Sequence, residues 1–573
     1  MNYRQEYERW LKYADTTTVA ELESIKDNEK EIEERFYRTL EFGTAGLRGI
    51  IGAGPNRMNS YVVGQATQGL ANQLIKTNPK DADLSVAIAY DSRIKSDEFA
   101  KTAAAILAAN GIKVYLFEEL KPVPELSFAI RYKNTTAGIV ITASHNPAKY
   151  NGYKVYGADG AQLNPELASI VLEEIDKTDI FNDVKTCDFD EAVKSGKIEL
   201  MGDDVEDAYL DCVQAQCINP ELVREKGGSL KFVYTPFHGS GNKPVRKILG
   251  RIGFSDVVVV KEQELPDGNF PTVASPNPEN KEGFELAIGY AKECGADLII
   301  GTDPDADRVG IIVKNKDGEY NTFTGNQVGA LLCEYILSSL SERGELAKDG
   351  YIVKTIVTTN LVKSICDAYG IEMKEVLTGF KFIGEKIKES EETGIGTYIL
   401  GFEESYGYLK GTYARDKDAV VATMLIAEMT LYYHDKGISL AEQMENIYKK
   451  YGYYLEYVES VTFEGKDGAD KISAIMDTMR NNTPKTVAGK KVLAVRDYKT
   501  SQRCDLSNGA IEKILLPASN VIYLELEDGN NFIVRPSGTE PKIKLYCLLR
   551  GKDISDAESL KSAIKQDIAD IVK

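Results

Sequence analysis

Three aspartates at alternate positions are the residues in this chain whose spacing points most directly to chemistry. Asp303, Asp305 and Asp307 follow the apolar run 298–300. In extended backbone alternate side chains point the same way, so three carboxylates would converge and repel one another unless a hard cation lay between them. A calcium-binding EF-hand loop would need Gly at its sixth place and Glu at its twelfth, but those places hold Arg and Lys. With no His or Cys nearby, the all-oxygen set predicts Mg²⁺ or Mn²⁺.

The same aspartates also allow two other interpretations. Asp305, Asp307 and Val309 match the D-x-D-x-V pattern of phosphatases that phosphorylate an aspartate, although Pro304 interrupts the strand where that fold needs it continuous. The plainer alternative is a solvated acidic turn between two buried strands. Strict alternation, with Arg308 next in the chain and able to reach a phosphate, favours the metal site.

A serine in the segment 142–147, Thr-Ala-Ser-His-Asn-Pro, is the best candidate nucleophile. The apolar run 138–141 predicts a short buried strand, and the Asn-Pro pair that follows favours a turn. We therefore expect Ser144 to be exposed at the carboxyl end of a strand, where open α/β sheets place their sites. A turn serine alone is a weak indication, and so is His145, one of three histidines in the chain.

The length and composition indicate a multi-domain globular protein. The 573 residues are too many for one core, and the charged fraction of 27% and hydrophobic fraction of 43% are ordinary for a soluble protein. No apolar run reaches the roughly 18 residues of a membrane helix, and the charged start has no apolar segment typical of a secretory signal. Eight cysteines without a C-x-x-C pair fit a reduced compartment. We therefore expect a cytoplasmic protein.

The net charge limits the partners. A formal charge of −19 disfavours nucleic acid and anionic membranes. An anionic substrate would then need a local cluster of cations. Side chains that could form such a cluster are those of Arg48, Lys154, Arg308, Lys417 and Arg535.

A strand–helix–strand pattern recurs three times and would position these residues. Its copies are 85–90, 99–110 and 113–117; then 230–234, 244–252 and 257–260; then 351–357, 361–369 and 373–376. Each helix ends near a glycine, at Gly111, Gly253 or Gly370, as a helix C-cap requires. Alternating strands and helices predict an α/β protein with largely parallel sheets.

The two ends of the chain depart from this pattern. The first 40 residues are rich in helix formers, with Thr17 and Thr18 as expected caps and Trp10 as the expected anchor of this arm. Near the carboxyl terminus, segments 455–463 and 521–526 alternate apolar and polar residues. That alternation predicts an antiparallel sheet with one wet face.

Four separated motifs resemble those of the α-D-phosphohexomutase family. They are a phosphoserine loop at 142–147, a metal loop at 303–308, a sugar loop (Glu-Glu-Ser-Tyr-Gly) at 403–407 and a phosphate loop (Arg-Pro-Ser-Gly-Thr) at 535–539. Segment 42–49 also resembles the amino-terminal signature of the family, with Ala45 where many members have serine. The motifs cover nearly the whole chain.

The resemblance implies an α/β fold with three related domains, each built on a mixed or parallel sheet, and a smaller α+β C-terminal domain around a central cleft. The expected bounds are 1–215 for the helical arm and phosphoserine domain, 216–324 for the metal-binding domain, 325–452 for the sugar-binding domain and 453–573 for the phosphate-binding domain.

The resemblance also implies roles for individual residues. Ser144 would carry a phosphoryl group, and phosphorylated Ser144 with Asp303, Asp305 and Asp307 would hold one Mg²⁺ per chain. Arg48, His145, Lys154 and Lys417 would surround the phosphoserine. Expected substrate contacts are Arg308, Thr378, Glu403, Ser405, Arg535, Ser537, Gly538 and Thr539.

The general acid and base are left open. Arg48 stays protonated and is a poor base, so we expect it to stabilise charge. Lys417 could act if burial lowered its pKa, but the charged run 415–418 could equally be solvated. Lys542 and Lys544 stand where the family often supplies another arginine of the phosphate site.

The implied reaction moves a phosphoryl group between two hydroxyls of one sugar. The Glu-Glu-Ser sequence at 403–405 resembles the glucose-specific sugar loop and favours glucose 1-phosphate and glucose 6-phosphate, with glucose 1,6-bisphosphate as intermediate and activator. Pentose and mannose phosphates are the alternatives within the family. A phosphatase using Asp305 as nucleophile and a non-catalytic phosphosugar-binding protein are alternatives of other classes. The chain has no Walker loop, and we expect a small-molecule partner and a monomer or homodimer.

Overall fold

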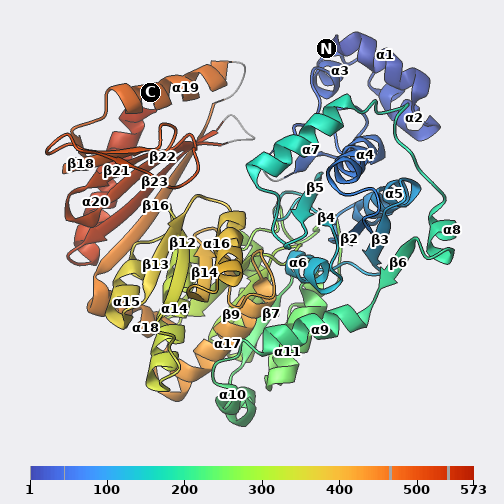
Figure 1. The fold of residues 1–573 in the computed structure, drawn as a ribbon. Helices are drawn as coiled ribbons and strands as arrows, with labels where there is room; N and C mark the ends of the chain where they lie inside the picture. The colour runs from blue at the N-terminus through green and yellow to red at the C-terminus, as the bar shows by residue number, and fades with distance from the viewer. Residues whose placement is uncertain (1, 44–45, 464–466, 538–541, 573) are drawn as a thin grey trace. The chain divides into compact units, whose positions relative to one another are not determined.

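The chain folds into two units, and each is described by itself. The computed structural model describes residues 2–43, 46–463, 467–537 and 542–572 (Figure 1). The first unit contains Met1–Phe323, Gly384–Gly394 and Tyr406–His434. The second contains Thr324–Ile383, Ile395–Ser405 and Asp435–Lys573.

The first unit begins with a helical arm, as predicted. Its helices are α1 (Tyr3–Tyr13), α2 (Thr16–Ser24) and α3 (Glu29–Phe36). Trp10 has no exposed surface and packs edge-on against Phe36 and Phe181, which confirms it as the anchor of the arm. The predicted caps of α2 are wrong. Asp15 caps the helix by accepting hydrogen bonds from the backbone N–H groups of Thr17 and Thr18, because a carboxylate satisfies two amides at once.

The first sheet has the strand order β1-β5-β4-β2-β3-β6. Strands β4, β2, β3 and β6 are parallel, and β5 runs antiparallel to both β4 and β1. The arm, α4, α5 and α7 share one apolar core with the sheet, and α6 packs against β2 and β4 with α9 beside it (Figure 1). The elements are β1 (Leu47–Ile50), α4 (Ser60–Thr77), β2 (Ser85–Tyr90), α5 (Ser96–Ala109), β3 (Lys113–Phe117), α6 (Val123–Tyr132), β4 (Ala137–Ile141), β5 (Tyr150–Gly157), α7 (Pro165–Lys177), α8 (Phe189–Lys194), β6 (Ile198–Met201) and α9 (Asp203–Gln214).

The second sheet, also in the first unit, has the order β11-β10-β9-β7-β8. Strands β9, β7 and β8 are parallel, whereas β10 and β11 are antiparallel additions at one edge. The elements are α10 (Pro220–Lys226), β7 (Phe232–Thr235), α11 (Asn242–Ile252), β8 (Val257–Val259), α12 (Lys261–Glu264), α13 (Glu285–Cys294), β9 (Leu298–Thr302), β10 (Val309–Lys314) and β11 (Tyr320–Phe323). The first unit also contains β15 (Gly407–Leu409), which is not a strand of this sheet, and α17 (Ala419–Asp435), which ends one residue past the unit.

The second unit contains a parallel arrangement of β13, β12 and β14, which confirms the third strand–helix–strand copy. Gly370, at the end of α15, has a φ of 68°, a conformation that suits the predicted glycine C-cap. The elements are α14 (Gly325–Glu342), β12 (Gly350–Thr355), α15 (Leu361–Tyr369), β13 (Glu372–Val376), α16 (Phe380–Thr393, divided between the units), β14 (Thr397–Glu403) and α18 (Leu440–Tyr451).

The carboxyl-terminal part of the second unit is an antiparallel sheet, as the alternating pattern predicts. Its order is β16-β23-β22-β21-β18-β19-β20, with β17 paired to β18. One face carries an apolar core made with α19 and α20. The elements are β16 (Tyr453–Thr462), α19 (Asp467–Asn481), β17 (Thr486–Val487), β18 (Lys490–Asp497), β19 (Gln502–Asp505), β20 (Ile511–Lys513), β21 (Ile522–Leu526), β22 (Asn531–Pro536), β23 (Lys542–Gly551) and α20 (Ile554–Ile571).

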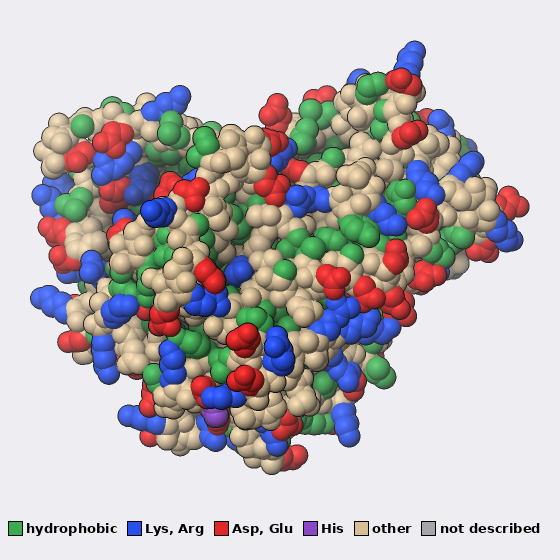
Figure 2. Space-filling view, turned by 60° about the horizontal axis from the view of Figure 1, so that its bottom comes forward, with side chains coloured by type: hydrophobic (Ala, Val, Ile, Leu, Met, Phe, Trp, Pro, Cys, Tyr) green, Lys and Arg blue, Asp and Glu red, His purple; other side chains and the backbone are tan. Residues whose placement is uncertain are grey.

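The surface is mixed in charge despite the formal net charge of −19. On the face shown in Figure 2, Lys and Arg side chains are interspersed with Asp and Glu. Among the described residues, no helix is long and apolar enough to cross a membrane. All eight cysteines are free thiols.

Candidate active site

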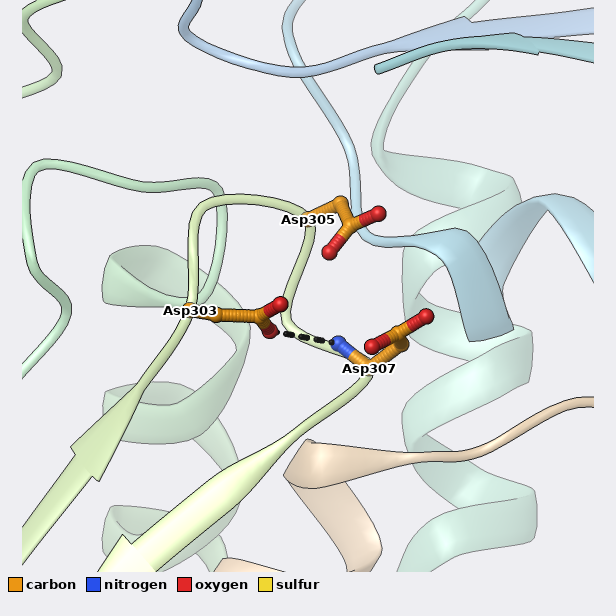
Figure 3. A group of neighbouring side chains, drawn as sticks. All are labelled: Asp303, Asp305 and Asp307. Carbon is orange, nitrogen blue, oxygen red and sulfur yellow. Dashed lines mark hydrogen bonds between the residues drawn. The ribbon is translucent and has the colours of Figure 1, made fainter. Parts of the chain in front are cut away.

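The three predicted aspartates lie in a tight turn between β9 and β10. The expected extended backbone is wrong, because Ala306 has a φ of 48° and its N–H bonds to the carbonyl of Asp303 at 2.9 Å. The turn nevertheless gathers the carboxylates, as Figure 3 shows, and one oxygen from each of Asp303, Asp305 and Asp307 lies within 4.8 Å of the others. Convergence therefore comes from the turn and not from strand alternation.

The loop after β7 holds this turn in place. The backbone N–H and the hydroxyl of Ser240 both donate to the carbonyl of Pro304 at 2.8 Å. A Cβ on Gly239 would lie 2.5 Å from the Pro304 Cα, so only glycine permits this approach.

The aspartates fit a divalent cation. Their exposure is 0% for Asp303 and Asp305 and 2% for Asp307. One oxygen of Asp303 accepts from the backbone N–H groups of Asp307 and Arg308, at 3.1 and 3.0 Å. Within the described part of the chain, Oδ1 of Asp305 and Oδ1 of Asp307 are buried without a hydrogen-bond donor. Buried carboxylate oxygens left in this way suit coordination of Mg²⁺ or Mn²⁺.

The pKa shifts of the three aspartates also suit a site for a divalent cation. Burial, followed by the charges of its two neighbours, raises the pKa of Asp303 well above its usual range. Burial and then the charge of Asp305 raise the pKa of Asp307. Burial also acts to raise the pKa of Asp305, but the Lys154 ammonium and a hydrogen bond with Asp303 outweigh it and lower that pKa. A divalent cation would relieve the repulsion that adds to the effect of burial in the upward shifts.

Ser144 lies directly beside the aspartates. Its Oγ donates to Oδ2 of Asp303 at 2.9 Å and lies 3.2 Å from Nδ1 of His145. The hydroxyl of Thr142 accepts from the Ser144 N–H at 2.8 Å and lies 3.0 Å from Oδ2 of Asp305. The predicted exposure of Ser144 is wrong. Only 3% of the residue is exposed, because it lies against Thr142, His145 and Asp303.

Two residues that the sequence analysis missed support the serine loop. Arg93 donates to the carbonyls of Pro147 and Tyr150 at 3.1 and 3.0 Å, and also to that of Ser144. Its Nε lies 3.3 Å from Oδ2 of Asp91, and neither side chain has exposed surface. An acid and a base placed directly after the predicted strand 85–90, at its carboxyl end, were the available signal.

Two lysines reach the aspartates. Lys154 Nζ lies 3.1 Å from Oδ2 of Asp305, and Lys417 Nζ lies 3.1 Å from Oδ2 of Asp307. Two arginines lie nearby: Arg48 on β1 donates to Oδ1 of Asn146 in the serine loop at 3.2 Å, and Arg308, which follows the aspartate turn, pairs with Oε1 of Glu279 at 2.9 Å.

The charged run around Lys417 is buried, so its interpretation as a solvated segment is wrong. Exposure is 2% for Arg415, 4% for Asp416 and 0% for Asp418. Asp416 binds Lys417 Nζ at 3.0 Å and accepts from the Tyr156 hydroxyl at 2.8 Å. Asp418 accepts from the first backbone N–H groups of α17. These contacts fix the direction of the lysine.

His145 is held neutral in this setting. Burial of the imidazole, followed by the charges of Arg308 and Arg48, lowers its pKa well below the usual range. Its backbone carbonyl accepts from the Ser275 hydroxyl at 2.7 Å. A neutral imidazole next to Ser144 can accept a proton.

The other predicted residues lie in the second unit. Glu403 ends β14 and accepts from the N–H of Gly379 at 2.8 Å, which places it beside half-buried Thr378. Ser405 follows two residues later and is also half-buried. Arg535 lies on β22, and the N–H of Ser537 bonds to the carbonyl of Lys542 at 2.7 Å. Gly538 and Thr539 lie outside the described residues, as does Ala45 of the amino-terminal signature.

Comparison with known proteins places this arrangement in a family. Three models of the phosphoglucomutase/phosphomannomutase family match the chain: α/β/α domain I at 39–180, domain II at 207–318 and domain III at 324–451. A phosphoglucomutase of Staphylococcus haemolyticus is 39% identical over 546 residues, covering 95% of this chain and 96% of the relative. The chain therefore belongs to the phosphoglucomutase/phosphomannomutase, or α-D-phosphohexomutase, family, and the predicted family is confirmed.

Solved structures agree on the fold. Parafusin, an exocytosis-sensitive phosphoprotein and phosphoglucomutase from Paramecium, superposes with a TM-score of 0.67 at 17% identity, covering 93% of this chain and 95% of that one. An N-acetylphosphoglucosamine mutase of Aspergillus fumigatus, solved with GlcNAc-6P and magnesium, gives a TM-score of 0.52 at 12% identity over 100% of both chains. The predicted α/β fold class is confirmed.

Proposed function

We propose that this chain is a phosphoglucomutase, which interconverts glucose 1-phosphate and glucose 6-phosphate. Relatives of that name match it over nearly its full length at about 39% identity. The observation that carries the proposal is the Ser144 hydroxyl, 2.9 Å from a carboxylate of the buried aspartate turn. The candidate phosphoryl acceptor and the candidate cation site are thus adjacent in one folded unit.

In this mechanism Ser144 carries the phosphoryl group in the resting enzyme. Mg²⁺ bound by Asp303, Asp305 and Asp307 would supply positive charge next to the transferring phosphoryl group. Lys154 and Lys417, already directed at the aspartates, neutralise the phosphate oxygens. Transfer to the sugar phosphate makes glucose 1,6-bisphosphate, and return of its other phosphoryl group regenerates phosphoserine.

Protons must move as the phosphoryl group moves. The attacking sugar hydroxyl loses a proton, and the Ser144 oxygen gains one when it leaves. His145, 3.2 Å from Ser144 Oγ, and Lys417 are the candidates for these transfers. Arg48, which keeps its charge, stabilises the transferring group instead.

The sugar has to bind in two orientations, and residues of the second unit suit that task. Glu403 and Ser405 would accept and donate hydrogen bonds to ring hydroxyls in either orientation. Arg535, with the backbone and side chains of Ser537, Gly538 and Thr539, would bind the phosphate that is not reacting, while Arg308 and Thr378 complete the substrate contacts.

The remaining expectations belong to the same proposal. The four domains 1–215, 216–324, 325–452 and 453–573 stay a prediction, as do the central cleft, the cytoplasmic location, the absence of nucleic-acid and membrane partners, and the monomeric or homodimeric state.

A coupled assay tests the substrate. The purified protein is supplied with Mg²⁺, a trace of glucose 1,6-bisphosphate and, in turn, the 1-phosphates of glucose, mannose, glucosamine and ribose. We expect glucose 1-phosphate to give the highest kcat/KM. Faster turnover of ribose 1-phosphate would replace the hexose assignment with a pentose one, and turnover of none of them would contradict mutase activity.

A further inference from the structure

A continuous series of polar contacts crosses the second unit. It starts in the carboxyl-terminal sheet, where Arg496 on β18 binds Oε1 of Glu525 through Nε at 2.6 Å. The guanidinium lies 4.5 Å from the centre of the Tyr523 ring. Its Nη1 reaches out of this sheet to Oε2 of Glu375 on β13, at 3.2 Å. One arginine therefore ties the carboxyl-terminal sheet to the parallel strands of the unit.

Glu375 also contacts a buried lysine. Its second oxygen, Oε1, accepts from Lys354 Nζ at 2.9 Å. Lys354 lies on β12 with no exposed surface. Burial acts to raise the pKa of Glu375, but Lys354 and Arg496 outweigh it and lower that pKa. The carboxylate is thus held ionised between two cations that belong to different sheets.

The lysine contacts the segment under the sugar loop. Lys354 Nζ also donates to the carbonyls of Thr358 and Thr355, at 3.0 and 3.3 Å. The hydroxyls of these two threonines lie 2.8 Å apart, and Oε2 of Glu404 accepts from that of Thr355 at 3.3 Å and from that of Thr358 at 3.2 Å. Glu404 stands between Glu403 and Ser405, so the series ends in the middle of the sugar loop.

The phosphate loop joins the same arrangement. Arg535 lies on β22, two strands from Arg496 in the sheet order. In the β22–β23 register Arg535 pairs with Lys544, which places Tyr546 on the same face one diagonal step away. Burial and then the charge of Glu404 raise the pKa of the Tyr546 hydroxyl, whereas Arg535 acts to lower it.

We propose that Glu375 is a positioning residue that fixes the sugar loop and the phosphate-loop sheet relative to each other, so that a sugar ring and its distal phosphate are gripped together. This inference rests on the proposed function and adds a residue to it. Glu375 does not touch substrate in this scheme. It acts through Lys354 on one side and Arg496 on the other, and its loss would remove the carboxylate that pairs with both buried Lys354 and half-buried Arg496.

The test separates binding from phosphoryl chemistry. For Glu375→Gln we expect the KM for glucose 1-phosphate to rise about tenfold, because both gripping loops are less well placed. In the same variant the slow hydrolysis of phospho-Ser144 by water should change by less than about twofold, since the groups around Ser144 lie in the first unit.

A double-mutant cycle shows whether the residues act as one path. We expect Arg496→Met to raise KM by a similar factor. The KM of the double variant should be at most about twice that of the single variant with the higher KM. Independent effects would instead multiply to about a hundredfold. If Glu375→Gln does not fold, Arg496→Met alone carries the same two expectations.

Two control variants exclude a loss of stability as the cause. Ile564→Val removes one carbon from a side chain in the core of the carboxyl-terminal sheet, and Lys490→Met removes the ion pair with exposed Asp528. Both should leave KM unchanged. The proposal is overturned if Glu375→Gln lowers Tm as Ile564→Val does but keeps the wild-type KM. Failure of the wild-type protein to turn over glucose 1-phosphate would instead refute the proposed function.

Discussion

The three buried carboxylates repel one another, and the side chains next to them show how the protein contains that repulsion. Lys154 and Lys417 each pair with one aspartate. With every group ionised, three negative and two positive charges leave one negative charge. A divalent cation would turn that balance to one positive charge, which suits an arriving phosphate. The site can therefore attract an anion although the whole chain has a formal charge of −19.

Binding of a metal ion should raise the stability of the folded protein. A cation present at 100 times its Kd raises the free energy of unfolding by about 2.7 kcal/mol. We expect Mg²⁺ to raise Tm of the wild-type protein and Asp307→Asn to lose most of that rise, because Oδ1 of Asp307 has no hydrogen-bond donor among the described residues. Differential scanning calorimetry with Mg²⁺ or EDTA measures it, with exposed Asp317→Asn as the control. An unchanged Mg²⁺ response in Asp307→Asn would contradict the metal site.

Ser144 should matter for chemistry and little for folding. Ser144→Ala removes the hydroxyl that bonds to Asp303 at 2.9 Å, a net loss of about 1 kcal/mol of stability. Mutase turnover should fall by a factor of at least about 10³, because the proposed mechanism carries the phosphoryl group on Ser144 alone. Ser364→Ala, which removes a hydroxyl bonded to Tyr454 in the second unit, should keep full turnover. Near-normal turnover of Ser144→Ala would exclude it as the nucleophile.

Strand β15 controls the direction of Lys417. A Cβ on Gly407 would lie 2.0 Å from Cδ of Lys417, so Gly407→Ala forces this lysine into another rotamer and away from Asp307. We expect kcat to fall at least about tenfold with little change in Tm. Gly250→Ala on α11, where a Cβ meets open space, is the matched control. If Gly407→Ala keeps wild-type kcat, the contact between Lys417 and Asp307 is not required for turnover.

Helix α6 carries a buried acid that makes stability depend on pH. Burial raises the pKa of Glu125 to about 8, against the charge of Lys121, and Glu206 adds to the shift. Lys247 also faces this group. Between its unfolded and folded pKa values the native state holds a proton that the unfolded chain releases. Stability should therefore fall by roughly 1.4 kcal/mol per pH unit as pH rises through this range.

The variant Glu125→Gln should remove that slope. Urea unfolding of both proteins at about pH 5.5 and about pH 7.5 isolates the contribution of this group, because other titrating groups are shared. We expect the stability of the variant relative to wild type to increase at the higher pH. Equal pH slopes in the two proteins would show that Glu125 is ionised throughout.

At the scale of elements, local patterns predict much of this fold. The strands 85–90 and 113–117 and the helix 361–369 lie within the predicted bounds because apolar runs and glycine C-caps are local signals. The aspartate turn is different. Its shape depends on the positive φ of Ala306 and on the Ser240 contacts to Pro304, and those partners are remote in the chain.

At the scale of the whole molecule, sequence distance hides which charges meet. Asp91 and Arg93 were missed because their importance depends on the carbonyls of a loop some fifty residues away. The sequence leaves open whether the run 415–418 is solvated, whereas in the fold partners such as Tyr156 bury it. The motifs could be found because each is contiguous, whereas the joining of Ser144 to Asp303 required the folded chain.

The location of the transferable phosphate tests the central claim most directly. The protein is incubated with Mg²⁺ and glucose 1,6-bisphosphate, and its peptides are mapped by mass spectrometry. We predict an acid-stable phosphate on Ser144 that is lost when glucose 1-phosphate is added. A base-labile acyl phosphate on Asp305, with Ser144 unmodified, would contradict the mutase mechanism and favour an aspartate-dependent phosphatase.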